Sequence, residues 1–531
     1  MIRDNWIPLI DSVCVRYHDE WNLEEGDQLK RLARGASLSW EWLLFKKIGS
    51  ETMFELMNDF LWSKLLVVIL IGIGLLFTIS SRFVQFRYFT RMFRILVSGH
   101  LFSKNQEGHL SSFQVLMLSV AGRVGGGNIA GVAVAITLGG PGAVFWMWVM
   151  GLIGMATSFV ECTLAQAYKR TAPGGGYFGG PAFYIIHGLG RKWKWLASLF
   201  SALLFVTFGF GFNSAQSYAV AVSLHDAFDV STIVLSFGLA CVVGIIISGG
   251  IKRIAKIADI LVPFMVFGYI LLACIVLVLN FHSIPSAFFM IIKSAFGFEP
   301  LVGGGIGVAV TMGVRRGLYS SEAGLGSAPN IAAVADISHP VAQGVVQSFS
   351  VFIDTMVICS CTAFIILLGD VYQPGSAEIT VTGVALTQAS LAGFIGVWGR
   401  LFISIALMLF GFTTIIYNYY LGENSLAWFG FQHKSIIIAY RIMVIILCMW
   451  GATSDLNTIF SFADITMGLL AVVNLLAITL LIKPALRLIR DYDHQIEQGI
   501  EEPVFDASVF AQHGIDKTIW CNSKRGGKIC N

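Results

Sequence analysis

The run from Ala121 to Gly131, A-G-R-V-G-G-G-N-I-A-G, places three consecutive glycines and a charge inside an apolar stretch long enough to cross a bilayer. In hydrocarbon every backbone N–H and C=O group needs a partner, so an unwound segment is stable there only inside protein or beside a cavity. The chain must therefore fold around this interruption. The amides and carbonyls that the interruption frees can bind a ligand, and we predict a binding site there.

The composition of the whole chain predicts an all-α integral membrane protein. Of the 531 residues, 56% are hydrophobic and 13% are charged, whereas soluble domains average about 25% charged residues. A net charge of +3 is too small over this length to suggest nucleic-acid binding. Taking about 20 apolar residues as one crossing, we predict eleven transmembrane helices, near 60–80, 113–138, 143–168, 195–224, 231–249, 257–279, 302–335, 340–368, 401–420, 436–450 and 456–482.

Basic residues predict how these helices are oriented, because Lys and Arg collect in cytoplasmic loops. They gather after the first, third, fifth and eleventh segments, whereas 225–229 and 370–382 contain none. The N-terminus should therefore be outside a cell (inner or plasma) membrane and the C-terminus inside. Residues 1–52 are basic and lack a signal-peptide layout, so we interpret them as a misassigned start or a disordered extension.

A second interrupted segment, from Val302 to Pro329, contains glycines together with Arg315, Arg316 and Glu322. It lies five segments after the first, so the two run through the membrane in opposite directions. This spacing predicts a five-plus-five inverted repeat whose two discontinuous helices form a site near the membrane midplane. Close packing through the G-x-x-x-G of Gly127 and Gly131 is an alternative, but it does not explain the matching second break.

The repeat divides the chain into five parts. We predict an N-terminal extension at 1–52, a first transmembrane helix with a basic cytoplasmic loop at 53–110, repeats at 111–280 and 281–482, and a cytoplasmic tail at 483–531. The last part of that tail, from Asp506 to Asn531, is expected to be solvated.

Several ordered motifs resemble the alanine or glycine:cation symporter family, which shares the leucine-transporter fold. The resemblance covers about Met53 to Arg490. The motifs are F-V-Q-F-R at 83–87, G-N-I-A-G-V-A at 127–133, L-G-G-P-G-A-V-F-W-M-W at 138–148, G-G-P-A-F-Y-I at 179–185, R-R-G-L-Y-S-S-E-A-G-L-G-S-A-P at 315–329, F-I-D-T at 352–355 and F-T-T-I-I at 412–416.

The resemblance implies sodium-coupled symport of small neutral amino acids by alternating access, with sodium as the coupling ion and no cofactor. It places sodium between the carbonyls of Ala121 and Val124 and the hydroxyls of Thr413 and Thr414. Hydroxyls supply oxygen ligands to a hard cation without adding charge. The alternative is that each Thr bonds only to its own helix backbone.

The resemblance also implies a substrate site. The carboxylate of the amino acid would meet backbone amides of the glycine run, and an asparagine would hold the broken backbone. The residues concerned are Gly125, Gly126, Gly127, Asn128, Gln216 and Asn418. Gln216 alone could equally form an interhelical hydrogen bond. Many family members have Thr at position 126 and some have Trp at 418, so the substrate side chain here can be larger than that of alanine, or polar.

Charges within the apolar segments are costly at depth, so they should be paired or face water. Seven such residues occur: Arg123, Glu161, Arg315, Glu322, Asp354, Glu423 and Asp464. We expect structural ion pairs to account for most of them. Arg123, Arg315, Glu322 and Asp354 are candidates for gating or coupling, and Asp354 is the first to test because it lies near the centre of an apolar segment.

Three other functions are weaker. A proton-coupled or exchange transporter of the same fold would differ in not depending on sodium. An ion channel would need a continuous polar lining, and no segment has a repeated polar face. An enzyme would need a nucleophile with a matched base or a metal-ligand cluster, and the sequence contains no pattern of this kind.

Overall fold

The computed structural model describes residues 57–58, 60–102, 110–172, 175–297, 305–373, 383–454, 456–508 and 514–520. The chain forms two units, Met1–Asn58 and Asp59–Asn531. The predicted extension at 1–52 lies outside the described residues, so all that follows concerns the second unit.

The described residues are almost entirely helical. The first half contains η1 (Phe60–Leu66), α4 (Val67–Ser80), α5 (Val84–Arg87), α6 (Phe89–Phe102), α7 (Ser112–Arg123), η2 (Gly127–Gly131), α8 (Val132–Gly139), α9 (Gly142–Ala167), α10 (Pro181–Tyr184), η3 (Ile185–Leu189), η4 (Arg191–Trp193), α11 (Lys194–Leu204), η5 (Phe205–Phe212), α12 (Asn213–Phe228), α13 (Thr232–Ile247) and α14 (Gly250–Leu279). A short antiparallel hairpin of β1 (Arg170–Thr171) and β2 (Tyr177–Phe178) follows α9.

The second half repeats this pattern of long helices joined by short elements. It contains η6 (Phe281–Ser283), α15 (Ile284–Ala295), α16 (Gly305–Ser321), α17 (Ser327–Ala332), α18 (Pro340–Val351), η7 (Phe352–Ile358), α19 (Cys359–Leu368), α20 (Val384–Ile395), α21 (Val397–Trp428), α22 (Lys434–Thr453), α23 (Leu456–Leu480) and α24 (Ile482–Glu497).

The helices confirm an integral membrane protein. In the described ranges, eight helices are long and apolar enough to cross a membrane, and the bent pair Ser112–Arg123 and Gly127–Gly139 makes nine. The other two predicted segments contain α13, which has 16 residues, and the second interrupted segment, formed by α16 and α17. Each of the eleven predicted segments thus contains a helix, which is consistent with eleven crossings.

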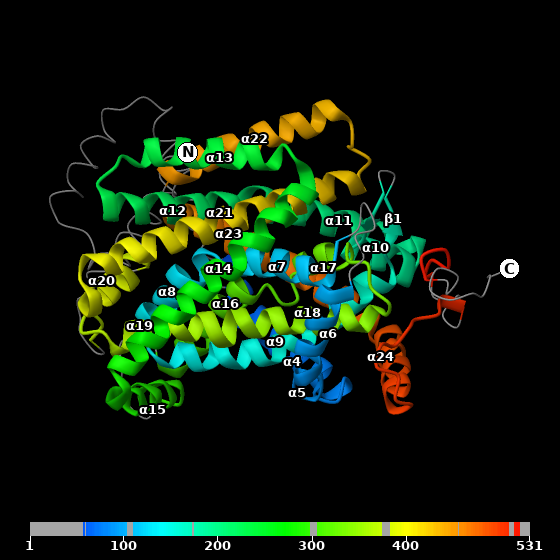
Figure 1. Cartoon of the computed structure of the whole chain (residues 1–531), viewed down its shortest axis with the longest axis horizontal. Coiled ribbons are helices and arrows are strands. Elements are labelled where there is room, and N and C mark those ends of the chain that lie inside the picture. The colour runs from blue at the N-terminus through cyan, green and yellow to red at the C-terminus, as the bar shows by residue number, and fades with distance from the viewer. Residues whose placement is uncertain are drawn as a thin grey trace, which may run out of the picture. The chain divides into compact units, whose positions relative to one another are not determined.

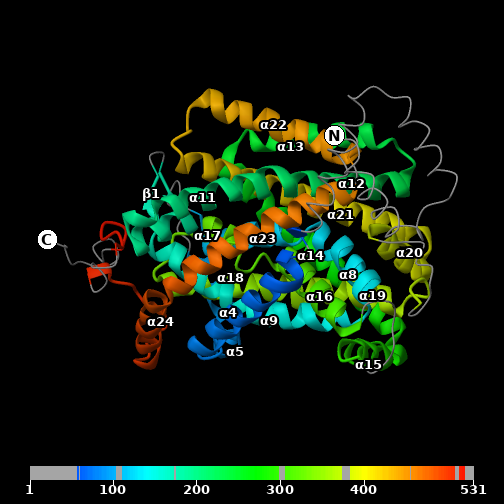
Figure 2. The same ribbon diagram turned by 180° about the vertical axis from the view of Figure 1, so that it is seen from behind.

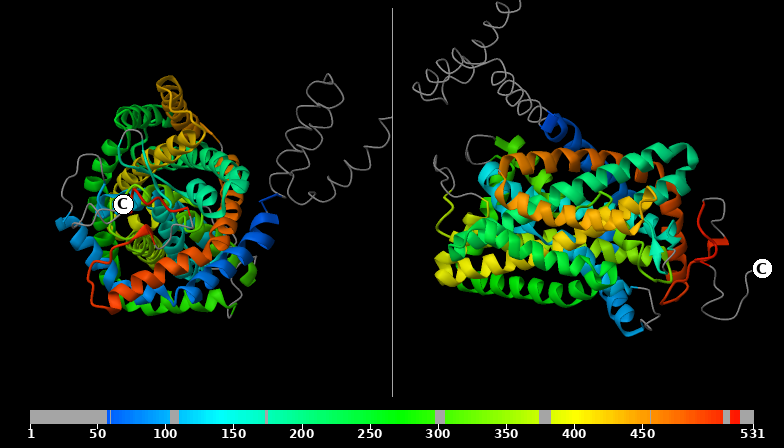
Figure 3. Two further views of the ribbon diagram at one scale, coloured as in Figure 1. Left: turned by 90° about the vertical axis from the view of Figure 1, so that its right-hand side faces the viewer. Right: turned by 90° about the horizontal axis from the view of Figure 1, so that it is seen from above.

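Corresponding helices of the two predicted repeats pack against each other: α9 against α18, α12 against α21, and α13 against α22. The pairs around α12 and α13 lie on one side of α7 and α14, and α9, α16 and α18 lie on the other (Figure 1, Figure 2). The axes of the long helices are roughly aligned, whichever way the chain runs along them (Figure 3). A pseudo-two-fold arrangement of two repeats produces pairs of this kind, while the boundaries at 111–280 and 281–482 remain a prediction.

Local residues set the start of the first interrupted segment and the break in the second. A capping box starts α7, because Ser111 Oγ accepts from the Gln114 amide at 3.1 Å and Gln114 Oε1 accepts from the Ser111 amide at 3.1 Å. In the second segment, Gly324 and Gly326 adopt φ values of 92° and 79°. These left-handed conformations favour glycine, so the helix stops at Ser321 and resumes at Ser327.

The C-terminal tail is not solvated as predicted, at least over its described part. Ala507 and Trp520 are buried. The Lys169 ammonium lies 4.6 Å from the centre of the Trp520 ring and 3.9 Å from that of Tyr177, and Phe505 contacts Trp520 edge-on at 5.4 Å. The Trp520 ring of the tail thus covers the Lys169 ammonium just beyond the end of α9, a cation–π contact that favours docking of the tail.

Trp520→Ala should release the tail, because it removes both the buried indole and the cation–π contact. We expect limited proteolysis to cut the tail at least about tenfold faster, equivalent to about 1.4 kcal/mol. Trp195→Ala is the control, since that indole is 60% exposed. Equal cleavage rates for Trp520→Ala and the wild type would contradict the docked tail.

Candidate functional site

The first break brings α7 and α21 unusually close. Helix α7 ends at Arg123, Val124 is extended with ψ 96°, and the chain bends by 50° before it continues through η2 and α8. A Cβ atom on Gly125 would lie only 2.7 Å from Thr414 Oγ1. Glycine is therefore required at position 125 for α21 to approach the broken backbone.

Five oxygen atoms gather where α21 meets this break. The Thr414 hydroxyl lies 2.9 Å from the Ala121 carbonyl, 3.4 Å from that of Val124 and 2.9 Å from that of Phe410. The Thr413 hydroxyl lies 2.9 Å from the same Phe410 carbonyl. All five groups are neutral, and the side chains of Thr413 and Thr414 are buried. A dry cluster of neutral oxygens suits a hard monovalent cation, which needs several oxygen ligands.

The two threonines are not equivalent. Thr414 bonds both to its own helix and across to α7, so it joins the two elements. Thr413 bonds to Phe410 and lies 3.9 Å from the Met265 sulfur on α14, so it reaches the cluster only through the Phe410 carbonyl. Sequence reasoning did not identify Phe410. Its position three and four residues before the two threonines is the signal that could have found it.

Side-chain oxygens accept hydrogen bonds from two backbone amides of the glycine run. Gly125 donates to Asn128 Oδ1 at 2.9 Å and Gly126 donates to Gln216 Oε1 at 2.8 Å. Asn128 therefore holds the unwound backbone, and Gln216 takes the position in which a carboxylate would bind Gly126. A Cβ at Gly126 would lie 3.1 Å from Gln216 Oε1 and 3.3 Å from the Ala219 Cβ. The space beside this glycine is thus filled by the chain itself.

Asn418 lies one turn after Thr414 on α21, and its side chain is fully buried. Neither its amide nitrogen nor its amide oxygen has a hydrogen-bond partner among the described residues. A buried polar group without a partner costs about 1–3 kcal/mol. A ligand that supplies the missing hydrogen bonds to this amide would recover a corresponding amount of free energy on binding.

Asp354 connects the two interrupted segments. Its carboxylate is fully buried on η7 and accepts from Asn128 Nδ2 at 2.5 Å, Ser320 Oγ at 2.8 Å and Thr355 Oγ1 at 2.7 Å. Asn128 belongs to the first break, and Ser320 lies at the end of α16 beside the second. A change in the charge of this carboxylate would therefore alter hydrogen bonds at both breaks.

Arg123 and Glu322 lie at the ends of the helices that precede the two breaks. Arg123 is buried and donates to the Gln347 carbonyl at 3.1 Å, to Ser158 Oγ at 2.9 Å and to Ser350 Oγ. Glu322 has a left-handed φ of 52° and is buried. These contacts hold the Arg123 guanidinium through neutral groups of α9 and α18.

Carboxylates support the second break. Glu322 accepts from Ser327 Oγ at 2.6 Å and from the Tyr417 hydroxyl at 3.3 Å. Glu161, on α9, accepts from the Gly324 amide at 3.2 Å and from Asn474 at 2.8 Å. Glu161 thus accepts from an amide that the break leaves without a helical partner, and Glu322 holds side chains beside the break.

Arg315 forms a structural cluster with the neighbouring Arg316 and with Asp464. Arg315 and Arg316 of α16 both pair with Asp464 of α23. The Arg315 guanidinium also lies 5.5 Å from the Trp62 ring, whose indole nitrogen donates to the Asp464 carbonyl at 3.3 Å. This cluster fixes the first membrane helix to α16 and α23.

Comparison with known proteins agrees with this architecture. A description of the sodium:alanine symporter family matches residues 47–507. A probable sodium/glutamine symporter, GlnT of Bacillus subtilis, is 44% identical over 464 residues, covering 87% of this chain and 95% of the relative. The amino-acid carrier protein AlsT of the same organism is 45% identical over 459 residues, covering 86% and 95%.

More distant similarities extend the comparison. The sodium/alanine symporter AgcS of Methanococcus maripaludis is 37% identical over 436 residues, covering 81% of this chain and 94% of the relative. Among solved structures, a manganese transporter of Eremococcus coleocola gives a TM-score of 0.48 at 15% identity, covering 72% of this chain and 82% of that chain.

The helices and these relatives define a multi-pass membrane transporter and not an enzyme. More specifically, the chain belongs to the sodium:alanine symporter family, whose description matches most of its length. Sodium-coupled symport of an amino acid is therefore its class of activity.

Asp354→Asn should reduce uptake at least tenfold with normal expression and folding, because it removes the negative charge that holds both breaks while preserving side-chain shape. Uptake by protein reconstituted in liposomes measures the effect. Asp370→Asn, at an exposed carboxylate beyond the end of α19, should leave uptake unchanged. Full activity of Asp354→Asn would remove this residue from the coupling machinery.

Proposed function

We propose that this protein carries sodium and a small neutral amino acid of the alanine or glycine type together into the cytoplasm by alternating access. The observation that carries the proposal is the Thr414 hydroxyl, which bridges the Ala121 and Val124 carbonyls of the broken helix. The proposed orientation has the N-terminus outside the cell membrane and the C-terminus in the cytoplasm.

Sodium would bind in the oxygen cluster at the first break. Its ligands would be the carbonyls of Ala121, Val124 and Phe410 and the hydroxyls of Thr413 and Thr414. Ion binding at this cluster would be coupled to the arrangement of the helices, because the ligands come from α7, the unwound residues and α21. A cation there would hold α21 against the break.

The substrate carboxylate would bind the amides of Gly126 and Gly127 at the start of η2. The positive end of a helix favours an anion at this position. Gln216 now accepts from Gly126 at 2.8 Å, so the arriving carboxylate would displace its oxygen. The freed Gln216 amide would then be able to donate to the same carboxylate.

The side chain of the substrate would extend toward Asn418. Its amide is buried and has no hydrogen-bond partner in the part of the chain that the structure describes, which favours a substrate whose side chain both donates and accepts hydrogen bonds. A site with buried polar groups strongly prefers the ligand that satisfies them. Among neutral amino acids, serine and glutamine meet this requirement, and one relative is named as a probable sodium/glutamine symporter.

Asp354 would couple the site to the conformational change, with Arg123 and Glu322 holding the ends of the interrupted helices. Arg315 would act mainly through its pairing with Asp464. Proton coupling is the second candidate mechanism, because Asp354 is a fully buried carboxylate between the breaks. Dependence of uptake on sodium at constant pH separates the two mechanisms.

Thr414→Val should weaken sodium binding at least tenfold, because it deletes the hydroxyl that joins α21 to the end of α7. The measurement is thermal stabilisation by sodium over a concentration series, with and without alanine. Thr414→Ser should restore the response. Thr479→Val is the matched control, since its hydroxyl bonds within its own helix to the Leu475 carbonyl at 2.7 Å. An unchanged sodium response in Thr414→Val would contradict the proposed ion site.

Asn418→Ala should weaken the binding of glutamine or serine at least tenfold while alanine binding changes less than threefold, because only the polar side chains need the amide. Sodium-dependent thermal shifts with each amino acid measure this. Asn280→Ala is the control, as that amide bonds to Val276 within its own helix. Equal losses for all three amino acids would show that Asn418 does not select the side chain.

A further inference from the structure

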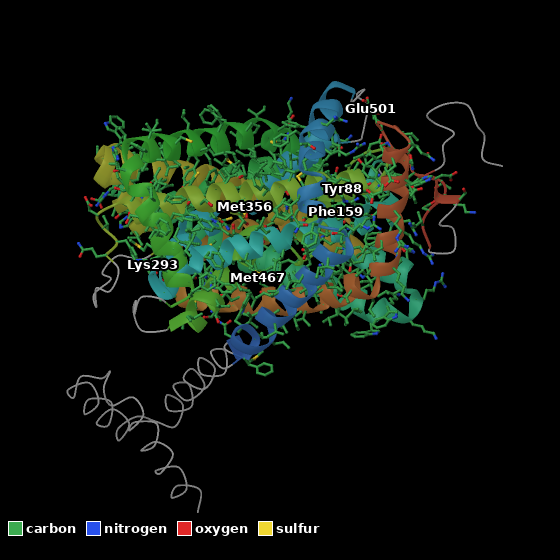
Figure 4. The ribbon with its side chains drawn as sticks, turned by 90° about the horizontal axis from the view of Figure 1, so that it is seen from below. Tyr88, Phe159, Lys293, Met356, Met467 and Glu501 are labelled. Carbon is green, nitrogen blue, oxygen red and sulfur yellow. The ribbon has the colours of Figure 1, made fainter. Side chains whose placement is uncertain are left out.

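A cavity of about 290 Å³ lies between the helices that follow the first membrane span and the helix that follows the last one. Tyr88 and Glu501 lie on this side of the molecule, where α5 and α6 approach α24 (Figure 4). Its lining is mainly charged: Arg87, Arg91 and Arg94 from α5 and α6, and Asp493 and Glu497 from α24. The sodium and amino-acid site uses none of these residues.

The chain reaches this cavity through a strained turn. Arg82 and Phe83 have left-handed φ values of 57° and 54°, a conformation that is strained for residues other than glycine. The turn leaves Phe83 and Phe86 exposed by 52% and 62%, just beyond the end of α4. The turn follows directly on the first membrane-spanning helix, which ends at Ser80. The cavity therefore lies at headgroup depth.

One group of residues fixes the walls of the cavity. Arg87 pairs with Asp493 at 2.6 Å, and the Tyr88 hydroxyl donates to the same carboxylate. Burial and the adjacent Asp493 raise the pKa of Tyr88, so the phenol stays protonated and keeps this bond. These three residues hold α5 against α24, and the charges of Arg87 and Asp493 neutralise each other.

Two guanidinium groups remain without a carboxylate partner. Arg91 donates to the Tyr492 hydroxyl at 2.9 Å and to the Glu501 carbonyl at 2.5 Å, both neutral acceptors. Arg94 is exposed and forms no ion pair with any residue in the described ranges. In the described lining three arginines, Arg87, Arg91 and Arg94, face two carboxylates, Asp493 and Glu497, so the lining carries a net positive charge.

We propose that this cavity binds the phosphate of an anionic phospholipid headgroup, with Arg91 and Arg94 as its ligands. Planar guanidinium groups bind phosphate oxygens in pairs, and basic pockets at the cytoplasmic side of membrane helices are suited to lipid headgroups. The exposed Phe83 and Phe86 beside the pocket favour a lipid over a free anion, because they offer its acyl chains an apolar contact. The lipid would stabilise the junction of α6 with α24.

The test compares additives on the full chain purified in a neutral detergent. Phosphatidylglycerol, phosphatidylcholine and inorganic phosphate are added at equal concentration, and the Tm is measured. We expect phosphatidylglycerol alone to raise the Tm, by about 2 °C or more. Arg94→Gln should lose at least half of that rise, and Lys192→Gln, at another exposed basic residue, should retain it.

Arg94 is exposed, so the variant should fold normally and keep its thermal response to sodium, which separates this site from the transport site. An equal rise for Arg94→Gln and the wild type would overturn the proposal. Inorganic phosphate as effective as the lipid would show a free-anion site instead. A rise of the same size with phosphatidylcholine would show a general effect of lipid and also overturn it.

Discussion

The need to pair every backbone group in a dry interior is the constraint on which this structure depends. Breaking α7 at Arg123 exposes amides and carbonyls that water cannot reach. Asn128 and Gln216 accept from the amides of Gly125 and Gly126, and Thr414 donates to the carbonyls of Ala121 and Val124. The surrounding helices are therefore held in place by the groups that make the break possible, and the same groups form the candidate site.

Buried charge follows the same logic. Asp354 accepts from residues at both interrupted segments, whereas Glu161 and Glu322 accept donors around the second. Arg123 is held by neutral acceptors and forms no ion pair within the described residues. Glu161 supplies an acceptor to the Gly324 amide, whereas Asp354 and Glu322 bind side chains beside the breaks. The positions of these acids are therefore determined by the breaks as much as by any gating role.

Local signals made most of the fold predictable. The length of an apolar stretch indicates a span, and glycines beside charges indicate an interruption, so both broken helices could be located from Ala121–Gly131 and Val302–Pro329. Contacts between distant segments could not be predicted in this way. Thr414 and Ala121 are 293 residues apart, and the threonine pair became a candidate only through family resemblance. The Gln216 contact with Gly126 and the docking of Trp520 over Lys169 had no local signal.

The hydrogen bond from Gly126 to Gln216 has a consequence for the energetics of substrate binding. In the proposed site, a carboxylate would exchange one hydrogen bond for another at this amide, so the contact would contribute only the difference between them. The empty carrier would then need no water or open cavity to satisfy its broken helix. An internal partner of this kind would keep affinity moderate and speed release, because Gln216 can return to the amide as the substrate leaves. In a carrier whose turnover is limited by substrate release, such moderate affinity is an advantage.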